Sequence, residues 1–228
     1  MPGDVNIAPI ALLFADQTRA SILQELSDGQ ALSAGELARR AHVTPSTAST
    51  HLAKLMDAGL LIAEKQGKHR YYRIADPAIV QAIEALAALA PVRQVHSLRE
   101  AQIAQAVRSA RMCSTHLAGK LGVDLTQALV NKGVLAASEE GYYMTSYGQQ
   151  WLCDFGIEGE ALKRRGLEVV SHHIDWSEHR PHIAGALGAA LAQRLFELQW
   201  ITRTPFSRAV RLTASGQLSL RDEFGIHI

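Results

Sequence analysis

The chain has 228 residues, of which 47% are hydrophobic and 20% are charged, so it can form a packed core and is not globally disordered. No apolar run approaches the ~18 residues of a membrane-spanning helix, so we expect no membrane association. The two cysteines, Cys113 and Cys153, cannot build a disulfide framework. Free thiols suit the reducing cytoplasm, which is the compartment that we expect.

The net charge of +1 conceals a local excess of positive charge. Residues 39–73 contain seven basic and two acidic residues and therefore carry +5. The rest of the chain has 16 basic and 20 acidic residues and carries −4. Localised positive charge on an otherwise mildly acidic protein indicates one anionic contact surface, and nucleic acid is the usual partner.

Three short helices are predicted first. Residues 15–26 have the apolar spacing of a supporting helix. The segment 33–36, Ser-Ala-Gly-Glu, is a capping box that opens a second helix ending near His42. Thr44, followed by a proline, caps a third helix, and Gly59 ends it. Two capped helices this close together predict a helix-turn-helix.

A basic strand pair follows the helix-turn-helix. Residues 60–64 and 69–74 flank the turn Lys65-Gln66-Gly67-Lys68, which has its glycine in place. A hairpin in this position predicts a winged helix.

We expect DNA to contact the third helix and the wing. Apolar residues of the helix from Pro45 to Ala58 turn inward, which leaves short hydroxyls for base edges or phosphates. No bidentate Arg or Asn reader is present there, so DNA shape is expected to contribute to sequence preference. The residues expected to contact DNA are Ser46, Thr47, Ser49, Thr50, His51, Lys54, Lys65, Lys68 and Arg70.

Residues 10–75 resemble the ArsR/SmtB family of bacterial winged-helix repressors. The resemblance rests on the segments Phe14-Ala15-Asp16-Gln17-Thr18-Arg19, Glu36-Leu37-Ala38, Ser46-Thr47-Ala48-Ser49-Thr50-His51-Leu52, Leu55-Met56-Asp57-Ala58-Gly59-Leu60 and Gly67-Lys68-His69-Arg70-Tyr71-Tyr72-Arg73. It covers less than a third of the chain. It implies a homodimer whose recognition helices enter successive major grooves of a double-stranded operator, and an inducer that releases the operator.

Two metal sites of family members have no counterpart in this chain. Residues 32–37 lack the Cys-x-Cys thiols of one type, and the helix predicted at 77–90 lacks the histidine of another. The Ala- and Leu-rich composition of that helix suits a dimer surface, with buried core as the alternative.

The C-terminal part contains an internal repeat. Residues 116–122 return as residues 182–188, 66 positions later, and further matches follow. We expect copies at about 113–158 and 175–228, each with two helices, a hairpin (134–145 or 201–212) and a helix.

The predicted fold class is mainly α with small β-hairpins. It comprises an N-terminal winged helix-turn-helix domain with a dimer helix (1–92), a connecting helix (93–112) and a tandem winged-helix-like repeat that senses an effector (113–228). Two copies related by a pseudo-twofold axis would enclose one junction, which favours a small-molecule or ion site.

Ligand-capable residues gather at this junction. Cys113 and His116 are spaced for one helical face, whereas His173 and Asp175 lie before the second copy, with Trp176 as an apolar wall. The segment around Trp176 resembles the Cys-x-Asp-Trp-Ser-Glu-Arg-Arg stretch of larger ArsR-type regulators, with His173 in place of the cysteine. The cofactor is unknown, but the set Cys113, His116, His173 and Asp175 suits zinc or a similar divalent metal. The alternative is that Cys113 and His116 are core residues.

The predicted function is therefore a DNA-binding transcriptional regulator, a repressor that an effector bound in the C-terminal domain releases. One alternative is thiol redox sensing through Cys113 and Cys153. Another is an enzyme with a Cys/His site, which we do not expect, because phosphate loops, nucleophile elbows and HExxH motifs are absent.

Overall fold

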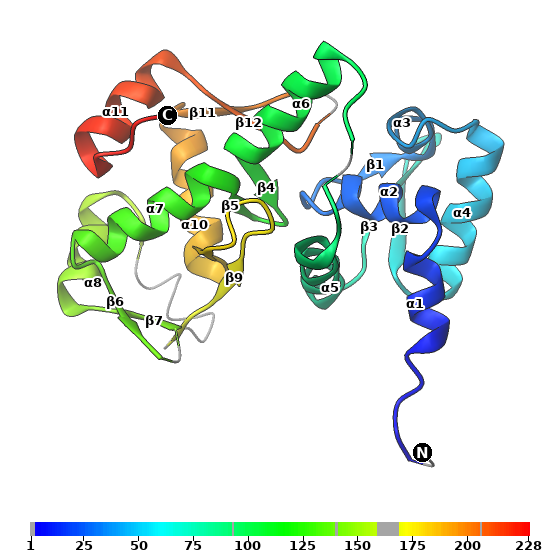
Figure 1. The fold of residues 1–228 in the computed structure, drawn as a ribbon, viewed down its shortest axis with the longest axis horizontal. Coiled ribbons are helices and arrows are strands. Elements are labelled where there is room, and N and C mark those ends of the chain that lie inside the picture. Colours follow the sequence, from blue (N-terminus) through cyan, green and yellow to red (C-terminus); the bar gives the residue numbers. More distant parts are fainter. Residues whose placement is uncertain (1–2, 93, 140, 159–168, 206) are drawn as a thin grey trace. The chain divides into compact units, whose positions relative to one another are not determined.

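The computed structural model describes residues 3–92, 94–139, 141–158, 169–205 and 207–228, and the chain divides into two compact units, residues 1–83 and 84–228. Both units consist mainly of helices with small antiparallel sheets, so the predicted fold class is confirmed (Figure 1). None of the helices described has both the length and the hydropathy needed to cross a bilayer.

The first unit is a winged helix-turn-helix, as predicted. Its elements are α1 (Ala8–Phe14), α2 (Gln17–Leu26), β1 (Leu32–Ser33), α3 (Ala34–Arg40), α4 (Pro45–Asp57), β2 (Leu61–Gln66) and β3 (His69–Ile74). Helix α5 (Pro77–Leu89) follows and continues past the boundary between the units. Helix α1 and strand β1 are additions to the elements that the sequence predicts.

Side-chain N-caps mark the starts of α2, α3 and α4 in this unit. The Asp16 carboxylate accepts a hydrogen bond from the Arg19 amide in the first turn of α2. Ser33 and Glu36 make both bonds of the capping box at α3, and Thr44 caps α4 with Pro45 in its first turn. Each cap satisfies an amide that lacks a partner within its helix, which is why these starts could be predicted.

One apolar core holds the three helices together. Each side chain in it gains about 1.5–3 kcal/mol from full burial. The helical residues with at most 1% exposure in this core are Ile22, Leu23, Leu26, Leu37, Leu52 and Leu55. Because α4 contributes only one face to this core, its other face is exposed.

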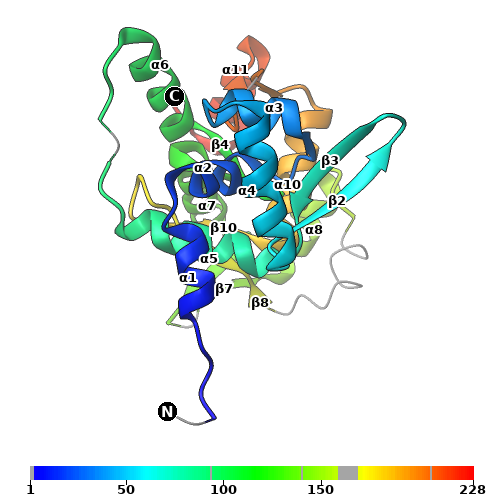
Figure 2. The ribbon, with the colours of Figure 1, turned by 90° about the vertical axis from the view of Figure 1, so that its right-hand side faces the viewer.

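The wing is a longer hairpin than predicted. Strands β2 and β3 pair from Leu61 opposite Ile74 to Gln66 opposite His69, which leaves a turn of Gly67 and Lys68. Gly67 has a φ of 60°, a left-handed conformation that glycine adopts without steric cost. Strand β1 pairs with the other edge of β3. Figure 2 shows the hairpin extending away from α4.

The second unit contains more elements. They are α6 (Leu98–Ser109), β4 (Arg111–Cys113), β5 (His116–Ala118), α7 (Gly119–Asn131), β6 (Leu135–Ser138), β7 (Gly141–Met144), α8 (Ser146–Asp154), β8 (Val169–Val170), β9 (His172–Ile174), β10 (Pro181–Ile183), α10 (Gly185–Glu197), β11 (Ile201–Arg203), β12 (Val210–Leu212) and α11 (Ala214–Phe224). The predicted hairpins at 134–145 and 201–212 are present as β6–β7 and β11–β12.

The order strand pair, helix, strand pair, helix occurs twice in this unit, from β4 to α8 and from β9 to α11. The two halves pack reciprocally: β5 lies against α10 and β10 against α7, and α7 and α10 share one apolar core (Figure 1). A Cβ atom added to Gly122 would lie 3.6 Å from His182 Cβ, and one added to Gly188 would lie 2.8 Å from His116 Cβ. The two halves therefore make equivalent contacts with each other.

Each half begins with a hairpin, so the predicted initial helix is wrong. Cys113 and His116 face each other across β4–β5, and Ser114 between them has a φ of 56°. This left-handed turn residue is incompatible with a continuous helix. The helix expected to reach Met112 ends at Ser109, since the backbone at Ala110 is already extended.

Candidate functional site

The exposed side of α4 carries four short hydroxyls. Ala48, Leu52 and Leu55 are buried on the opposite side of the helix. The exposed hydroxyl residues are Ser46, Thr47, Ser49 and Thr50. Their small size would let a partner approach the backbone of α4 closely.

Two of these hydroxyls donate to their own helix. Ser49 Oγ donates to the Pro45 carbonyl at 2.9 Å, and Thr50 Oγ1 donates to the Ser46 carbonyl at 3.3 Å. Each oxygen keeps its lone pairs for an outside donor. In this arrangement both hydroxyls suit the amino groups of bases better than phosphate oxygens.

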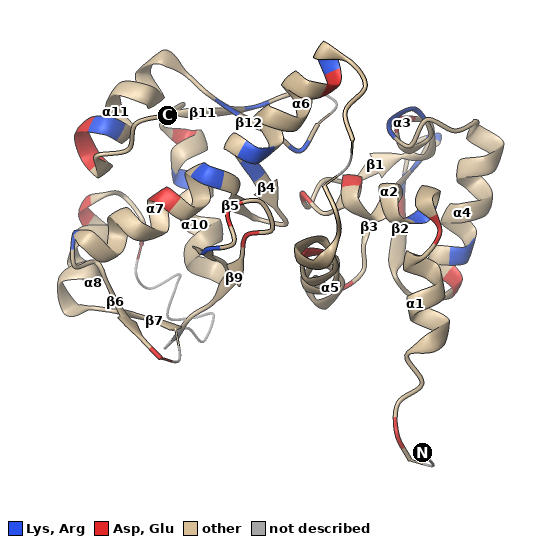
Figure 3. Cartoon of the chain, viewed as in Figure 1, with Lys and Arg blue, Asp and Glu red and all other residues tan. Residues whose placement is uncertain are grey.

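The other two predicted residues of α4 have different surroundings. His51 is half-buried, and its Nδ1 atom lies 3.5 Å from Asp16 Oδ1, so the ring connects α4 to the start of α2. Lys54 is exposed and is the one Lys or Arg of α4, visible as its blue segment in Figure 3. Of the two, Lys54 is placed to reach an anionic partner.

The wing brings basic side chains together. Lys65 and Arg70 are direct cross-strand partners, and Lys68 follows in the turn. Like charges opposite each other destabilise a strand pair in the absence of an anion. Arg70 also lies 5.8 Å from the centre of the Tyr72 ring, whereas Arg73 forms an ion pair with Glu64 at 2.9 Å. The unpaired positive charge therefore lies at the tip of the wing, where it suits phosphate.

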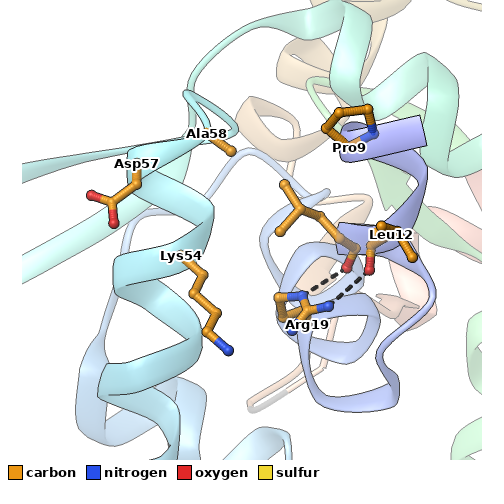
Figure 4. A pocket seen from close by; sticks show the side chains of 7 residues that line it. Pro9, Leu12, Arg19, Lys54, Asp57 and Ala58 are labelled. Atoms are coloured by element: carbon orange, nitrogen blue, oxygen red, sulfur yellow. Dashed lines mark hydrogen bonds between the residues drawn. The ribbon is translucent and has the colours of Figure 1, made fainter. Parts of the chain in front are cut away.

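A hollow lies beside α4, and its lining offers a small-molecule ligand few polar groups that lack a partner within the protein. It has a volume of about 460 Å³ and lies between α1, α2 and the end of α4 (Figure 4). Its arginine, Arg19, already donates to the carbonyls of Leu12 and Leu13 at 2.8 and 3.0 Å. Lys54 and Asp57 are its other charged residues.

A compact cluster of ligand-type side chains lies in the second unit. It consists of Cys113, His116, His173 and His182, whose potential ligand atoms all lie within 4.8 Å of one another. Cys113, His116 and His182 are at most 2% exposed, and His173 is half-buried. The structure thus brings together three of the four residues predicted as ligands.

Two hairpins supply the cluster, one from each half of the unit. Cys113 pairs with His116 across β4–β5, and His173 pairs with His182 across β9–β10. Side chains at directly opposed positions lie on one face of a hairpin, so each hairpin presents two side chains together. The Nε2 atoms of His116 and His182 are 3.3 Å apart.

Burial determines the charge of the cluster. It lowers the pKa of His116 to about 2 and that of His182 to about 4, with the neighbouring rings adding to the shift at His116. Burial also lowers the pKa of His173 and raises the pKa of the Cys113 thiol. The three imidazoles are therefore neutral at pH 7, which is the form that binds metals.

Asp175, the fourth predicted ligand, lies outside the cluster. Its Oδ2 atom accepts from Arg111 Nη2 at 2.8 Å and from the Gly119 amide at 2.6 Å. Its Oδ1 atom accepts from the amide and the hydroxyl of Ser177 at 2.8 and 2.7 Å. Both oxygens are thus engaged by a buried guanidinium and the neighbouring loop, and neither is available as a primary ligand.

Trp176 packs against Arg111, whereas the sequence predicted it to form an apolar wall of the effector pocket. The Arg111 guanidinium lies 4.4 Å from the centre of its ring, within cation–π distance. The side chain of Arg111 is fully buried, and Trp176 and Asp175 are among the residues that contact it, together with Glu84 and Ser177.

His182 is the member of the cluster that sequence reasoning missed. It occupies the position in the second copy that His116 occupies in the first, 66 residues earlier. The repeat was therefore a usable signal: one ligand-type histidine in the first copy implies its counterpart in the second.

The two cysteines occupy contrasting environments. Cys113 is fully buried, whereas Cys153 is exposed on α8. A redox switch needs a thiolate that oxidants can reach, and burial disfavours the thiolate of Cys113. The burial of Cys113 therefore disfavours a redox switch between the two cysteines.

In comparisons with known proteins, residues 16–63 match the family of bacterial regulatory proteins described as the arsR family. The chain is 42% identical over 223 residues to YdfF of Bacillus subtilis (strain 168), described as an uncharacterized HTH-type transcriptional regulator, covering 98% of this chain and 99% of YdfF. It is 35% identical over 77 residues to the HTH-type transcriptional regulator CmtR of Mycobacterium bovis, covering 34% of this chain and 64% of CmtR.

Solved structures match a part of the chain. HlyU from Vibrio cholerae shares 32% identity, with a TM-score of 0.34, over 36% of this chain and 88% of HlyU. The transcriptional repressor BigR from Xylella fastidiosa shares 22% identity, with a TM-score of 0.36, over 38% of this chain and 88% of BigR.

Proposed function

Because the chain belongs to the ArsR family of HTH-type transcriptional regulators, we propose that it is a repressor that releases its operator when an effector binds in the second unit. DNA binding belongs to the first unit, whose winged helix-turn-helix contains the residues that match the family. The observation that carries the effector proposal is the buried Cys113, His116, His173 and His182 cluster. A regulator that only bound DNA would have no use for these side chains.

The reading surface consists of α4 and the wing. The exposed hydroxyls of α4 contact base edges, and Lys54 together with Lys65, Lys68 and Arg70 contacts phosphates. His51 positions α4 through Asp16.

The protein acts as a homodimer through α5. Leu86 and Leu89 on this helix are 49% and 85% exposed, although the helix is rich in Ala and Leu. Exposed apolar side chains on one helix favour contact with an equivalent helix, and twofold symmetry then pairs two reading surfaces with two half-sites.

The protein is not an enzyme, and it acts in the cytoplasm. Its relatives are transcriptional regulators. Its effector cluster offers four possible protein ligands, and four protein ligands are typical of structural rather than catalytic ions.

A promoter assay tests this function. The purified protein should shift DNA from upstream of its own gene at concentrations that leave scrambled DNA of equal length unbound. Deletion of its gene should raise expression of a reporter driven by that promoter. A fall in reporter expression would show an activator, and equal binding to both DNAs would contradict operator recognition.

A further inference from the structure

We propose that Cys113, His116, His173 and His182 form a four-coordinate site for a divalent d-block cation of the zinc type, and that this cation is the effector. The regulatory part of this inference rests on the function proposed above. The ligand set differs from the one predicted from sequence because His182 replaces Asp175.

The distances suit an ion of this size. Bonds of about 2.0–2.3 Å to zinc place the ligand atoms of a tetrahedron about 3.3–3.8 Å apart. The Nε2 atoms of His116 and His182 are 3.3 Å apart, and no pair within the set exceeds 4.8 Å. Small side-chain rotations would therefore complete the coordination without movement of the strands.

The cluster contains buried polar atoms that lack partners. Among the described residues, Nδ1 of His173 and Nδ1 of His182 are buried and accept or donate no hydrogen bond. Burying polar groups without partners costs free energy, and a core with no ligand role would use apolar side chains in their place. A cation bound in the cluster would compensate Nδ1 of His173, whereas Nδ1 of His182 faces Asp175.

Asp175 lies next to the site and can orient the His182 ring. Its Oδ2 atom lies 4.0 Å from Nδ1 of His182, while Nε2 of the same ring faces His116. A carboxylate behind a ligating histidine orients the ring and increases its basicity. A small shift of His182 toward Asp175 would close this hydrogen bond. The residue predicted as a ligand thus has a role as a positioning residue.

The donor set selects the class of ion. One thiolate and three imidazoles offer no oxygen ligand for Mg²⁺ or Ca²⁺. A single sulfur also disfavours thiophilic ions that need several thiolates. Nitrogen with one sulfur suits Zn²⁺ and its neighbours, and four protein ligands leave no open position for catalysis.

The position of the site explains how an ion would act as a signal. Two ligands come from β4–β5 in the first half and two from β9–β10 in the second. A bound ion would therefore fasten the two halves of the second unit together. A ligand that stabilises one arrangement of the halves shifts the population toward it, as an effector must.

Cobalt titration of the metal-free protein tests the site. Full-length protein should bind one Co²⁺ per chain, with the visible bands of tetrahedral cobalt and a near-ultraviolet thiolate charge-transfer band, and one equivalent of Zn²⁺ should remove both. Cys113→Ser should abolish the charge-transfer band and lower Zn²⁺ affinity at least tenfold. His182→Gln should lower it similarly.

Matched controls come from the same unit. Cys153→Ser changes the exposed cysteine, and His179→Asn changes an exposed histidine in the β9–β10 loop while tolerating its φ of 52°. Both variants should bind cobalt as the parent does. Circular dichroism verifies folding, and the near-isosteric Cys113→Ser remains informative where His182→Gln does not fold. Unchanged zinc affinity in Cys113→Ser, or an absence of stoichiometric binding by the parent, would overturn the site.

Operator binding with and without Zn²⁺ separates the two proposals. Zinc should weaken binding of the parent to its operator at least tenfold and leave that of Cys113→Ser unchanged. One ion per chain without any effect on DNA would preserve the site and overturn its role as effector. Operator binding relieved by another compound, with no metal bound, would preserve the proposed function and overturn the metal site.

Discussion

Individual side chains in this protein take their roles from their partners more than from their type. Asp175 and Asp124 are both aspartates in ion pairs, but Asp175 is fully buried against Arg111, whereas Asp124 pairs at the surface with Lys120. Their contributions to stability should therefore differ.

We expect Asp175→Asn to destabilise the second unit by about 3–5 kcal/mol, because it leaves the charge of Arg111 buried and uncompensated. Asp124→Asn should cost less than about 1 kcal/mol, as exposed pairs do. Chemical denaturation of the metal-free protein measures both. Glu84 Oε2 lies 3.9 Å from Arg111 Nη2, so a loss below about 1 kcal/mol for Asp175→Asn would show that Glu84 alone balances the arginine.

The capping box gives the first unit a pH-dependent contribution. Hydrogen bonds from the Ser33 hydroxyl and amide lower the pKa of Glu36 below its usual 4.5. Because the pKa is lower in the folded state, this contribution is present in full above about pH 4.5 and is lost as the pH falls through the lowered pKa.

Accordingly, Ser33→Ala should cost about 1 kcal/mol of the free energy of unfolding at pH 7, and the deficit should shrink between pH 4.5 and pH 3. Denaturation of the full chain at several pH values, followed through the first unit, measures this deficit. A deficit that stays constant down to pH 3 would mean that the Glu36 carboxylate takes no part in the cap.

At the scale of elements, the wing and α4 should contribute differently to DNA binding. Replacing Lys68 and Arg70 together by glutamine should weaken binding to operator and scrambled DNA alike, because phosphate contacts carry little sequence information. The slope of log affinity against log salt should become shallower by about 1.8. Arg73→Gln is the matched control in the same hairpin, because Arg73 is already paired with Glu64. A selective loss on the operator would indicate base reading by the wing.

Helix α4 should show the opposite pattern. Thr50→Leu places a bulky apolar side chain on its exposed strip and removes an acceptor, so operator affinity should fall by about 1–3 kcal/mol with little change on scrambled DNA. Fluorescence anisotropy with both DNAs measures the difference. Equal losses on the two DNAs would mean that another face of α4 lies in the groove.

At the scale of the molecule, the two units should respond separately to metal. Zinc at 100 times its dissociation constant should stabilise the second unit by about 2.7 kcal/mol and leave the first unit unchanged. Differential scanning calorimetry with and without a chelator measures the unfolding of each unit separately. Stabilisation of the first unit alone would place the ion outside the Cys113 cluster.

The sequence by itself determined the first unit, its caps and its likeness to ArsR regulators. Its signals act over a few residues: a hydroxyl three positions before a carboxylate, a proline in a first turn, a glycine in the turn between two strands. A spacing of three residues was ambiguous at Cys113 and His116, because both a helical turn and a tight hairpin bring such a pair together.

Only the tertiary structure decided which side chains share the buried cluster. Its two hairpins lie about 60 residues apart in the chain, as the pairs Cys113–His116 and His173–His182 show, and reciprocal packing of β5 on α10 and β10 on α7 brings them together. For the same reason His182, to which the sequence assigned no ligand role, joins the cluster, whereas Asp175 does not. The buried Arg111 pairs with the Asp175 carboxylate, and the packing of the two hairpins places His182 beside His116.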